Sequence, residues 1–581
     1  MAVDFRNTNT VWASVAVETL ARLGLQTAVI CPGSRSTPLT LAFAAHPDLE
    51  AIPVLDERSA AFFALGIAKQ TGRATALVCT SGTAGANFFP AVVEARESRV
   101  PLLVLTADRP PELRHCRAGQ AIDQLKLYGH YPTWQVPLAT PALDRSLLRY
   151  LRQTMVRAWE RTRFPVSGVV HLNVPFRDPL PPLPQPEADT FSQTFPEDFF
   201  DGITPCKPGS LRLSIGEVDR VFSELGNCER GAIVVGIDRP HNPQQYARAI
   251  ARLSKTLGFP VLADGLSPLR NHAALNPDLI STYDFLLRDR ETARNLAPEV
   301  VVQIGELPTS KVLREWLSDL QAKTWILDPS DRNVDPLHSK TTHLRISIEQ
   351  FFSPDPLAVK GRESDFCQRW READATVCQT LDRTLSDTTE IVEPKIAWWL
   401  SQTLPPHTPL FVSNSMPVRD VEWFWRPSDT GVQVFCNRGA NGIDGTLSTA
   451  LGVAQGNRPS VLLTGDLALL HDTNGFLLRR HLRGHLTIVL VNNNGGGIFE
   501  MLPIAQFDPP FEDFFATPQS VEIRHLCRAY GIDYCAIESW SHFTEALRVL
   551  PETGVRLLEL RTDRKADAAW RQRAFKHLAI L

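Results

Sequence analysis

The 581-residue chain lacks the features that mark membrane, nucleic-acid-binding or disulfide-stabilised proteins. It contains no run of about 18 apolar residues, the length that a transmembrane helix needs. Its net charge of −4 is small for its length and gives no indication of a nucleic-acid partner. Its ten cysteines include no CxxC pair and are expected to be reduced thiols. We therefore expect a cytoplasmic protein with no membrane span and no nucleic-acid partner.

Other common motifs are also missing. The N-terminal segment has polar residues and an amphipathic helical pattern, not the basic and apolar regions of a signal peptide. There is no short-period repeat, no Walker A motif and no complete GxGxxG motif. The absence of the two nucleotide-binding motifs argues against one hypothesis, a non-catalytic nucleotide-binding or regulatory α/β protein.

The distribution of apolar residues predicts the fold class. Hydrophobic residues make up 43% of the chain, enough for several cores. Short runs of Val, Ile and Leu alternate with amphipathic helical stretches in three blocks, which is the pattern of parallel sheets. Proline-rich or polar stretches at 178–209 and near 351–363 separate the blocks, and the first is expected to contain no helix. The predicted fold is α/β with three doubly wound parallel-sheet domains, at 1–182, 210–355 and 356–581, and a linker at 183–209.

Two strand ends in the last block carry polar side chains. The segment SVLLTGDLALL (460–470) places Asp466 after one strand, and LTIVLVNNNGGGIF (486–499) places Asn493 after the next. The residues between them have the length and composition of a crossover helix, so the two ends meet where parallel sheets bind ligands. A carboxylate and an amide oxygen suit Mg²⁺, which is usually completed by water and ligand phosphates. The pattern predicts a magnesium-bound diphosphate.

The spacing of Asp466 and Asn493 resembles the signature of thiamine-diphosphate enzymes, which begins Gly-Asp-Gly and ends in paired asparagines. This chain has Leu467 in place of the third glycine. The resemblance implies thiamine diphosphate together with Mg²⁺, for which Mn²⁺ can substitute. The implied metal ligands are Asp466, Asn493 and the backbone carbonyl of Gly495, and Gly465 and Leu467 are implied to bind the cofactor.

Glu57 lies at a strand–helix junction in the first block. A lone Glu at a helix N-terminus is usually a surface residue stabilised by the helix dipole. In thiamine-diphosphate enzymes a Glu in this position contacts the aminopyrimidine and drives its tautomerisation, so the resemblance implies a catalytic role. The segment VCTSGTAGANFF implies cofactor contacts from Thr80, Gly82 and Asn87. Because Glu57 and Asp466 belong to different blocks, the resemblance also implies active sites at the interface of a homodimer or homotetramer.

Several arginines follow strand ends. Guanidinium groups bind carboxylates in bidentate fashion, so such arginines suit acidic substrates. A single arginine at a strand end would be unremarkable. Four arginines within glycine-containing segments predict substrates with several carboxylates. These arginines are Arg35, Arg109, Arg419 and Arg438.

The motifs together resemble one family over the whole chain. PGSRST, DERS, LTADRPPEL, GQAI, NSMPVRD, NRGANGIDG, GDLALLHD and NNNGGGIFEMLP occur in the order found in 2-succinyl-5-enolpyruvyl-6-hydroxy-3-cyclohexene-1-carboxylate (SEPHCHC) synthases. That family has GDL where its relatives have GDG, so Leu467 is a family feature. The resemblance implies decarboxylation of 2-oxoglutarate and conjugate addition of the four-carbon unit to isochorismate, in menaquinone or phylloquinone biosynthesis.

The same resemblance implies residue roles. Ser415 and Arg419 hold the distal carboxylate of the succinyl unit, and Ser415 also contacts the cofactor. Ile443 and Ile498 are implied cofactor contacts, Ile443 supporting its bent shape, and Ile498, Phe499 and Leu502 form an apolar wall beside the substrate. Gln120 is implied in later proton transfers. The residues implied around isochorismate are Ser34, Arg35, Arg109, Gln120, Lys311 and Arg438.

Two alternatives remain open on the sequence. One is another thiamine-diphosphate carboligase or decarboxylase acting on a different 2-keto acid, although a small neutral acceptor would not need four arginines. Bound flavin in the purified protein would favour it. The other is the non-catalytic protein, against which intact Glu57, Asp466 and Asn493 argue. Failure to bind thiamine diphosphate would revive that hypothesis.

Overall fold

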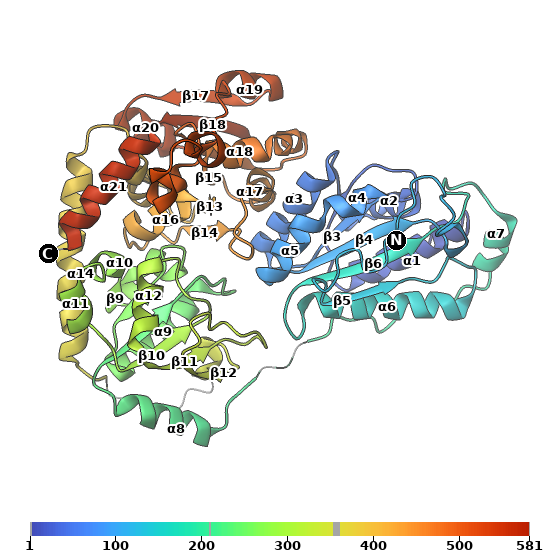
Figure 1. The fold of residues 1–581 in the computed structure, drawn as a ribbon. Helices are drawn as coiled ribbons and strands as arrows, with labels where there is room; N and C mark the ends of the chain where they lie inside the picture. Colours follow the sequence, from blue (N-terminus) through green and yellow to red (C-terminus); the bar gives the residue numbers. More distant parts are fainter. Residues whose placement is uncertain (1–2, 208, 210, 353–360, 580–581) are drawn as a thin grey trace.

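A computed structural model describes residues 3–207, 209, 211–352 and 361–579. These residues form three α/β domains, each built on a six-stranded parallel sheet with helices packed against it (Figure 1). The predicted fold class is therefore confirmed. The break predicted near 351–363 lies mostly outside the described residues. Within the described part of the chain, every helix is too short or too polar to span a lipid bilayer.

The first domain has the strand order β2-β1-β3-β4-β6-β5. Its central strands are buried along their whole length, because helices cover both faces and the strands are almost entirely apolar. The elements are α1 Thr8–Arg22, β1 Thr27–Ile30, α2 Thr37–Ala45, β2 Glu50–Pro53, α3 Glu57–Thr71, β3 Thr75–Cys79, α4 Thr83–Asn87, α5 Phe89–Glu97, β4 Leu102–Asp108, η1 Pro111–Leu113, β5 Trp134–Pro137, α6 Arg145–Arg163 and β6 Val169–Pro175.

The proline-rich connection after this domain contains a helix, contrary to the sequence prediction. Helix α7 spans Pro186–Ser192. Its proline occupies the beginning of the helix, where a backbone N–H has no helical partner and its loss costs nothing. The prediction was wrong because proline breaks a helix only in the interior.

The middle domain has the order β12-β11-β10-β7-β8-β9. The chain adds strands in one direction across the sheet from β7 to β9 and in the opposite direction from β10 to β12. The elements are α8 Ile215–Gly226, β7 Gly231–Val235, α9 Pro243–Leu257, β8 Val261–Ala263, η2 Pro268–Asn271, η3 Ala273–Leu275, β9 Leu279–Ile280, α10 Tyr283–Leu286, α11 Arg290–Asn295, β10 Val300–Ile304, α12 Lys311–Leu320, β11 Lys323–Leu327, β12 Lys340–Leu344 and α13 Ile348–Phe351.

The third domain has the order β14-β13-β15-β16-β18-β17, the same topology as the first. Its elements are α14 Asp365–Asp387, α15 Glu393–Thr403, β13 Pro409–Val412, α16 Met416–Phe424, β14 Gln433–Cys436, α17 Thr446–Ala454, β15 Ser460–Gly465, α18 Asp466–His471, η4 Thr473–Arg480, β16 His485–Asn492, η5 Gly497–Met501, η6 Pro503–Gln506, η7 Glu512–Ala516, α19 Ile523–Tyr530, β17 Asp533–Ile537, α20 Trp540–Arg548, β18 Gly554–Arg561 and α21 Arg564–Ala579.

The crossover between β15 and β16 differs in detail from the prediction of one helix. It consists of α18 and the 3₁₀ helix η4, separated by Asp472 in a non-helical conformation. The Asp472 carboxylate accepts hydrogen bonds from the backbone N–H and the hydroxyl of Ser448. This tertiary contact outweighs the local helical preference of the segment.

The third sheet joins the other two domains through its two faces. Leu463 and Val491 belong to a core that continues into the middle domain. Leu462 and Leu490, which point the opposite way, belong to a core shared with α3 and α5 of the first domain. Figure 1 shows α3 beside α17, and the two helices approach closely because a Cβ on Gly66 would lie 2.1 Å from the backbone oxygen of Thr449.

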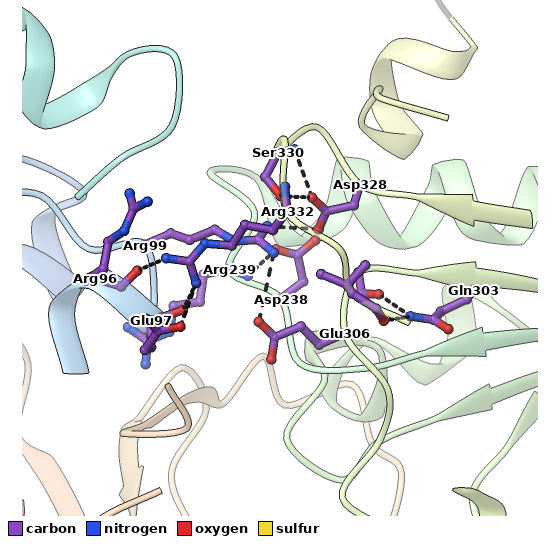
Figure 2. Close-up of polar contacts among 12 residues, drawn as sticks. Arg96, Glu97, Arg99, Asp238, Arg239, Gln303, Glu306, Asp328, Ser330 and Arg332 are labelled. Atoms are coloured by element: carbon purple, nitrogen blue, oxygen red, sulfur yellow. Dashed lines mark hydrogen bonds and ion pairs between the residues drawn. The ribbon is translucent and has the colours of Figure 1, made fainter. Parts of the chain in front are cut away.

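The first and middle domains meet through charged side chains (Figure 2). Arg99 Nη1 lies 2.8 Å from Asp328 Oδ2, and Arg332 Nη1 lies 2.9 Å from Glu97 Oε2. The Asp328 side chain is almost fully buried, and the charge of Arg99 helps to lower its pKa against the effect of burial. These contacts fix the C-terminal end of α5 against the middle sheet.

Candidate active site

Asp466 follows β15 at the carboxyl edge of the third sheet. The parallel pairing of β15 with β16 brings the segment after β16 beside it. Asp466 Oδ1 accepts a hydrogen bond from Leu467 N, and Oδ2 accepts one from Gly495 N, both at 2.8 Å. Burial raises the pKa of Asp466 to about 6. A bound cation would therefore relieve the cost of ionising this carboxyl group.

Asn493 and the glycines that follow it add oxygen atoms to the same edge of the third sheet. Asn493 is buried, and its Oδ1 has no hydrogen-bond partner among the described residues. Gly495 has φ of +141°, and a Cβ there would lie 2.4 Å from the Ala516 carbonyl oxygen. The free amide oxygen, the Asp466 carboxylate and a backbone carbonyl form a donor set that fits Mg²⁺. Within the described residues no cluster of three His, Cys, Asp or Glu side chains could hold a metal, so a cation here needs ligands from water or phosphate.

Two arginines lie at the same edge of the sheet. Ser415 has φ of +74° and directly precedes α16, and Arg419 Nη1 donates to its backbone oxygen at 2.6 Å. Arg438 Nη1 donates to Asn414 Oδ1 at 3.0 Å. Burial and then the charge of Arg438 lower the pKa of Arg419. Two guanidinium groups near enough to perturb each other form a site for an anion.

The segment that carries Arg438 also carries Ile443. Asn414 Nδ2 donates to the backbone oxygens of Asn437 and Gly442, at 2.6 and 2.7 Å. Thr446 Oγ1 donates to the oxygen of Ile443 at 2.8 Å. The turn after β13 and the turn after β14 are therefore held together, which places the predicted residues of both turns in one region.

Glu57 is the first residue of α3 and follows the N-cap Asp56. Asn87 Nδ2 donates to Glu57 Oε2 at 3.3 Å, so the structure brings together these two predicted cofactor residues. Asn474 Nδ2 of the third domain donates to Asp56 Oδ2 at 2.8 Å.

A second group of predicted residues gathers at the edge of the first sheet. Arg35 N donates to Thr80 Oγ1 at 3.2 Å, and the charge of Arg109 contributes, after burial, to a lowered pKa of Arg35. Gln120 Nε2 donates to Ser81 O at 3.2 Å, and a Cβ on Gly82 would lie 3.0 Å from Gln120 Cγ. Ser34 is exposed beside Arg35. These residues form one polar region at this edge of the first sheet, in which Arg35 and Thr80 are buried and Ser34 is exposed.

The remaining predicted residues are more dispersed. Leu467 is the second residue of α18, and its backbone N–H donates to Asp466 Oδ1. Ile498 and Phe499 lie in η5, and Leu502 follows η5 with an exposed side chain. Lys311 is exposed at the start of α12 and pairs with Glu315 at 3.3 Å. Within the described residues, no hydrogen bond or ion pair joins Glu57 to Asp466 or Asn493 of the same chain.

Sequence reasoning missed residues whose role depends on tertiary contacts. Lys69 and Glu94 of the first domain contact the turn that carries Arg438. Arg314, on α12, lies close enough to Arg438 for that charge to contribute, after burial, to a lowered pKa of Arg314. No motif marks these positions in the sequence.

Comparison with known proteins identifies the family. Three family models match: the N-terminal TPP binding domain of thiamine pyrophosphate enzymes at 11–127, their middle domain at 224–412 and their C-terminal TPP binding domain at 424–560. The SEPHCHC synthase of Gloeothece citriformis is 58% identical over 572 residues, covering 98% of both chains. The enzyme of the same name from Rippkaea orientalis is 56% identical over 582 residues, covering 100% of this chain and 98% of the relative.

This chain belongs to the SEPHCHC synthase family. It is a thiamine-diphosphate-dependent enzyme, and Glu57 lies in its N-terminal and Asp466 in its C-terminal TPP-binding domain. The SEPHCHC synthase of Trichormus variabilis, 58% identical over 577 residues, also matches along 98% of both chains. The similarity therefore extends through the middle domain as well.

Proposed function

We propose that this chain decarboxylates 2-oxoglutarate and adds the resulting four-carbon unit to isochorismate, giving SEPHCHC in menaquinone or phylloquinone biosynthesis. The observation that carries the proposal is the pairing of two sites on one sheet edge. Asp466 and Asn493 offer oxygen ligands, and Arg419 and Arg438 offer two positive charges close enough to affect each other. A diphosphate–metal group and a dicarboxylate fit these two sites side by side.

The cofactor would be held from both TPP-binding domains. Asp466, Asn493 and the carbonyl of Gly495 would bind Mg²⁺, or Mn²⁺ in its place, and through it the diphosphate. Gly465 and Leu467 would flank the diphosphate, and Ser415, Ile443 and Ile498 would contact the rest of the cofactor. Thiamine diphosphate supplies a carbon nucleophile and an electron sink for the loss of carbon dioxide.

The first domain would supply the proton-transfer group. Glu57 would exchange a proton with the aminopyrimidine nitrogen that it contacts, and Asn87 would keep the Glu57 carboxylate in place through its hydrogen bond. Thr80 and Gly82 would shape the backbone around the same ring. Gln120 would serve later proton transfers.

The substrates would be positioned by charge and shape. Arg419 would bind the distal carboxylate of 2-oxoglutarate, with Ser415 as a second hydrogen-bonding group. Phe499 and Leu502 would cover the apolar part of the substrate and exclude water. The isochorismate carboxylates and hydroxyl would be bound by Ser34, Arg35, Arg109, Gln120, Lys311 and Arg438.

The test is a direct assay. Purified protein is incubated with thiamine diphosphate, Mg²⁺ and 2-oxoglutarate, and the loss of isochorismate is followed by its absorbance. We expect turnover that depends on the protein, thiamine diphosphate, Mg²⁺ and 2-oxoglutarate together. Chelation of the metal should abolish it. Equal efficiency with pyruvate in place of 2-oxoglutarate, or bound flavin, would instead indicate a carboligase for a different 2-keto acid.

We further propose that the active site is shared between two subunits, with Glu57 of one chain facing Asp466 of another. Hybrid dimers test this arrangement. Glu57→Gln and Asp466→Ala chains are each expected to be inactive, but their mixture should regain activity because a hybrid dimer contains one site without either substitution. Random association should restore about a quarter of wild-type activity. No recovery after subunit exchange would show that Glu57 and Asp466 of one chain serve the same site.

A further inference from the structure

A buried ion pair of the first domain holds the backbone of the third. Lys69 lies near the end of α3 and Glu94 lies on α5, with side chains 1% and 4% exposed. Lys69 Nζ lies 3.3 Å from Glu94 Oε1. It also donates to Asn437 Oδ1 at 2.7 Å and to the backbone oxygen of Cys436 at 2.5 Å. All three ammonium hydrogens thus have acceptors, and two of these belong to the third domain.

Glu94 binds the next part of the same turn. Its Oε1 accepts a hydrogen bond from Gly439 N at 3.1 Å, and Oε2 accepts one from Ala440 N at 2.7 Å. Ser98 Oγ also donates to Oε1. The carboxylate and the ammonium group therefore bind backbone atoms on either side of Arg438. Hydrogen bonds to charged groups are stronger than those between neutral groups, so this turn is firmly fixed.

The turn at 436–445 connects β14 to α17 and contains both Arg438 and Ile443. Its close contact with the first domain leaves no room for a side chain at Gly439, where a Cβ would lie 2.7 Å from Ser98 N. Asn414 holds the opposite side of the turn through Asn437 O and Gly442 O. The direction of the Arg438 side chain therefore depends on groups from two domains.

We propose that Lys69 and Glu94 are positioning residues that aim Arg438 at the carboxylate of isochorismate. This inference rests on the proposed function. Among the described residues, no hydrogen bond or ion pair joins Lys69 or Glu94 to the guanidinium group of Arg438, and both bind the chain on either side of it. A shift of about 1 Å in a binding group can lower the rate on the order of 100-fold, so a fixed turn contributes to catalysis without touching substrate.

The experiment compares Lys69→Met and Glu94→Gln with a matched control. Lys69→Met keeps an unbranched side chain, shorter by one atom, and removes its charge, while Glu94→Gln keeps the shape and one acceptor oxygen. Lys395→Met is the control, because Lys395 is also buried and donates to backbone oxygens, those of Ser386 and Thr388, away from the turn. The measurements are KM for isochorismate, decarboxylation of 2-oxoglutarate without isochorismate, and thermal stability.

Both test variants should raise KM for isochorismate on the order of 10- to 100-fold. Decarboxylation of 2-oxoglutarate alone and the affinity for thiamine diphosphate should change much less, because Asn414 still holds the Ile443 side of the turn through Gly442 O. Lys395→Met should lower thermal stability and leave KM for isochorismate unchanged. A wild-type KM in both test variants, or equal losses in both half-reactions, would overturn the positioning role.

Hydrogen–deuterium exchange supplies a readout that does not depend on activity. Peptides covering 436–445 should exchange faster in Lys69→Met and Glu94→Gln than in wild type or Lys395→Met, and Lys69→Arg should restore part of the protection. If Lys69→Met does not fold, Glu94→Gln alone decides the question. Unchanged exchange would refute the positioning role, whereas failure of the wild-type protein to consume isochorismate would refute the proposed function instead.

Discussion

The carboxylate of Asp466 accepts a hydrogen bond from the backbone N–H of Gly495 at 2.8 Å, across 29 positions of sequence. This bond ties the segments that follow β15 and β16 together. Asn493, two residues before Gly495, keeps a buried oxygen without a partner among the described residues. The protein's own hydrogen bond therefore holds two segments of the predicted metal site next to each other.

Asp466→Asn should remove metal-dependent cofactor binding while leaving the fold intact. The amide keeps an oxygen that can accept from Gly495 but has no charge for the cation. Loss of a group outside the metal's own ligands usually costs 10- to 100-fold in affinity, so loss of the charged ligand should exceed about 100-fold. Titration of thiamine diphosphate with Mg²⁺ measures the effect, and Asp513→Asn, an exposed change nearby, is the control. Equal affinities for the two variants would contradict the assignment.

Glu57→Gln should slow proton exchange at the reactive thiazolium carbon of bound cofactor. The change keeps the shape and the contact with Asn87 but removes the carboxylate that transfers the proton. General acid–base groups contribute about 10²- to 10⁴-fold, and the exchange rate should fall by that order. Rapid-quench hydrogen–deuterium exchange measures it. Asn87→Ala, which only frees the carboxylate, should have a smaller effect, and wild-type exchange in Glu57→Gln would remove this residue from the mechanism.

Arg419→Ala should discriminate between keto acids. Removing one partner of a desolvated ion pair costs about 3–5 kcal/mol, which corresponds to roughly 10²- to 10³-fold or more in kcat/KM for 2-oxoglutarate. A keto acid without the distal carboxylate should lose far less. Arg419→Lys, which keeps the charge without the planar fork, should fall between the two. Equal losses with both keto acids would mean that Arg419 supports the fold or the cofactor.

Asp472→Asn should flatten the dependence of stability on pH. Burial raises the pKa of Asp472 from 3.8 to about 7, so between these values the folded chain holds a proton that the unfolded chain has released. The stabilisation from this group is full below the unfolded pKa of 3.8, decreases as the pH rises above that value, and is lost once the pH passes about 7. At pH 8 the uncharged variant should gain up to about 4 kcal/mol relative to wild type, from about 1.4 kcal/mol per pH unit.

Denaturant titrations at pH 5 and pH 8 measure this difference. The gain at pH 8 should exceed any gain at pH 5, because Asp472 is already protonated at the lower pH. Asp533→Asn, an exposed change on β17, should leave the difference unchanged. A parallel shift of Asp472→Asn at both pH values would show that Asp472 is ionised throughout.

The sequence was sufficient for the features that follow from local pattern. The apolar runs predicted parallel sheets, and the polar residues after β15 and β16 predicted that Asp466 and the Gly495 segment meet. It was insufficient where a distant contact decides the outcome. The break at Asp472 depends on Ser448, and the role of Lys69 depends on a turn more than 360 residues away. No local feature of the sequence distinguishes a buried lysine near the end of an amphipathic helix from a lysine that is exposed to solvent.

Lys311 shows what a single chain leaves untested. The family resemblance implied a substrate contact for Lys311, whose side chain within this chain is exposed and paired with Glu315, so its role stays a prediction. Arg314, one turn further along α12, is the residue whose pKa the charge of Arg438 helps to lower. Which side of a short helix faces a site depends on the packing of the domains, and that packing is not encoded in the helix alone.

The third sheet has a consequence for how the chain unfolds. The first domain has a hydrophobic core of its own on one side of its sheet, and so does the middle domain. Both faces of the third sheet, in contrast, are buried against side chains that belong partly to its neighbours. The third domain therefore cannot open without exposing apolar surface in the other two, whereas either neighbour can lose part of its structure alone. Native-state hydrogen exchange should be slowest in β15 and β16, the strands on which the cofactor site is built.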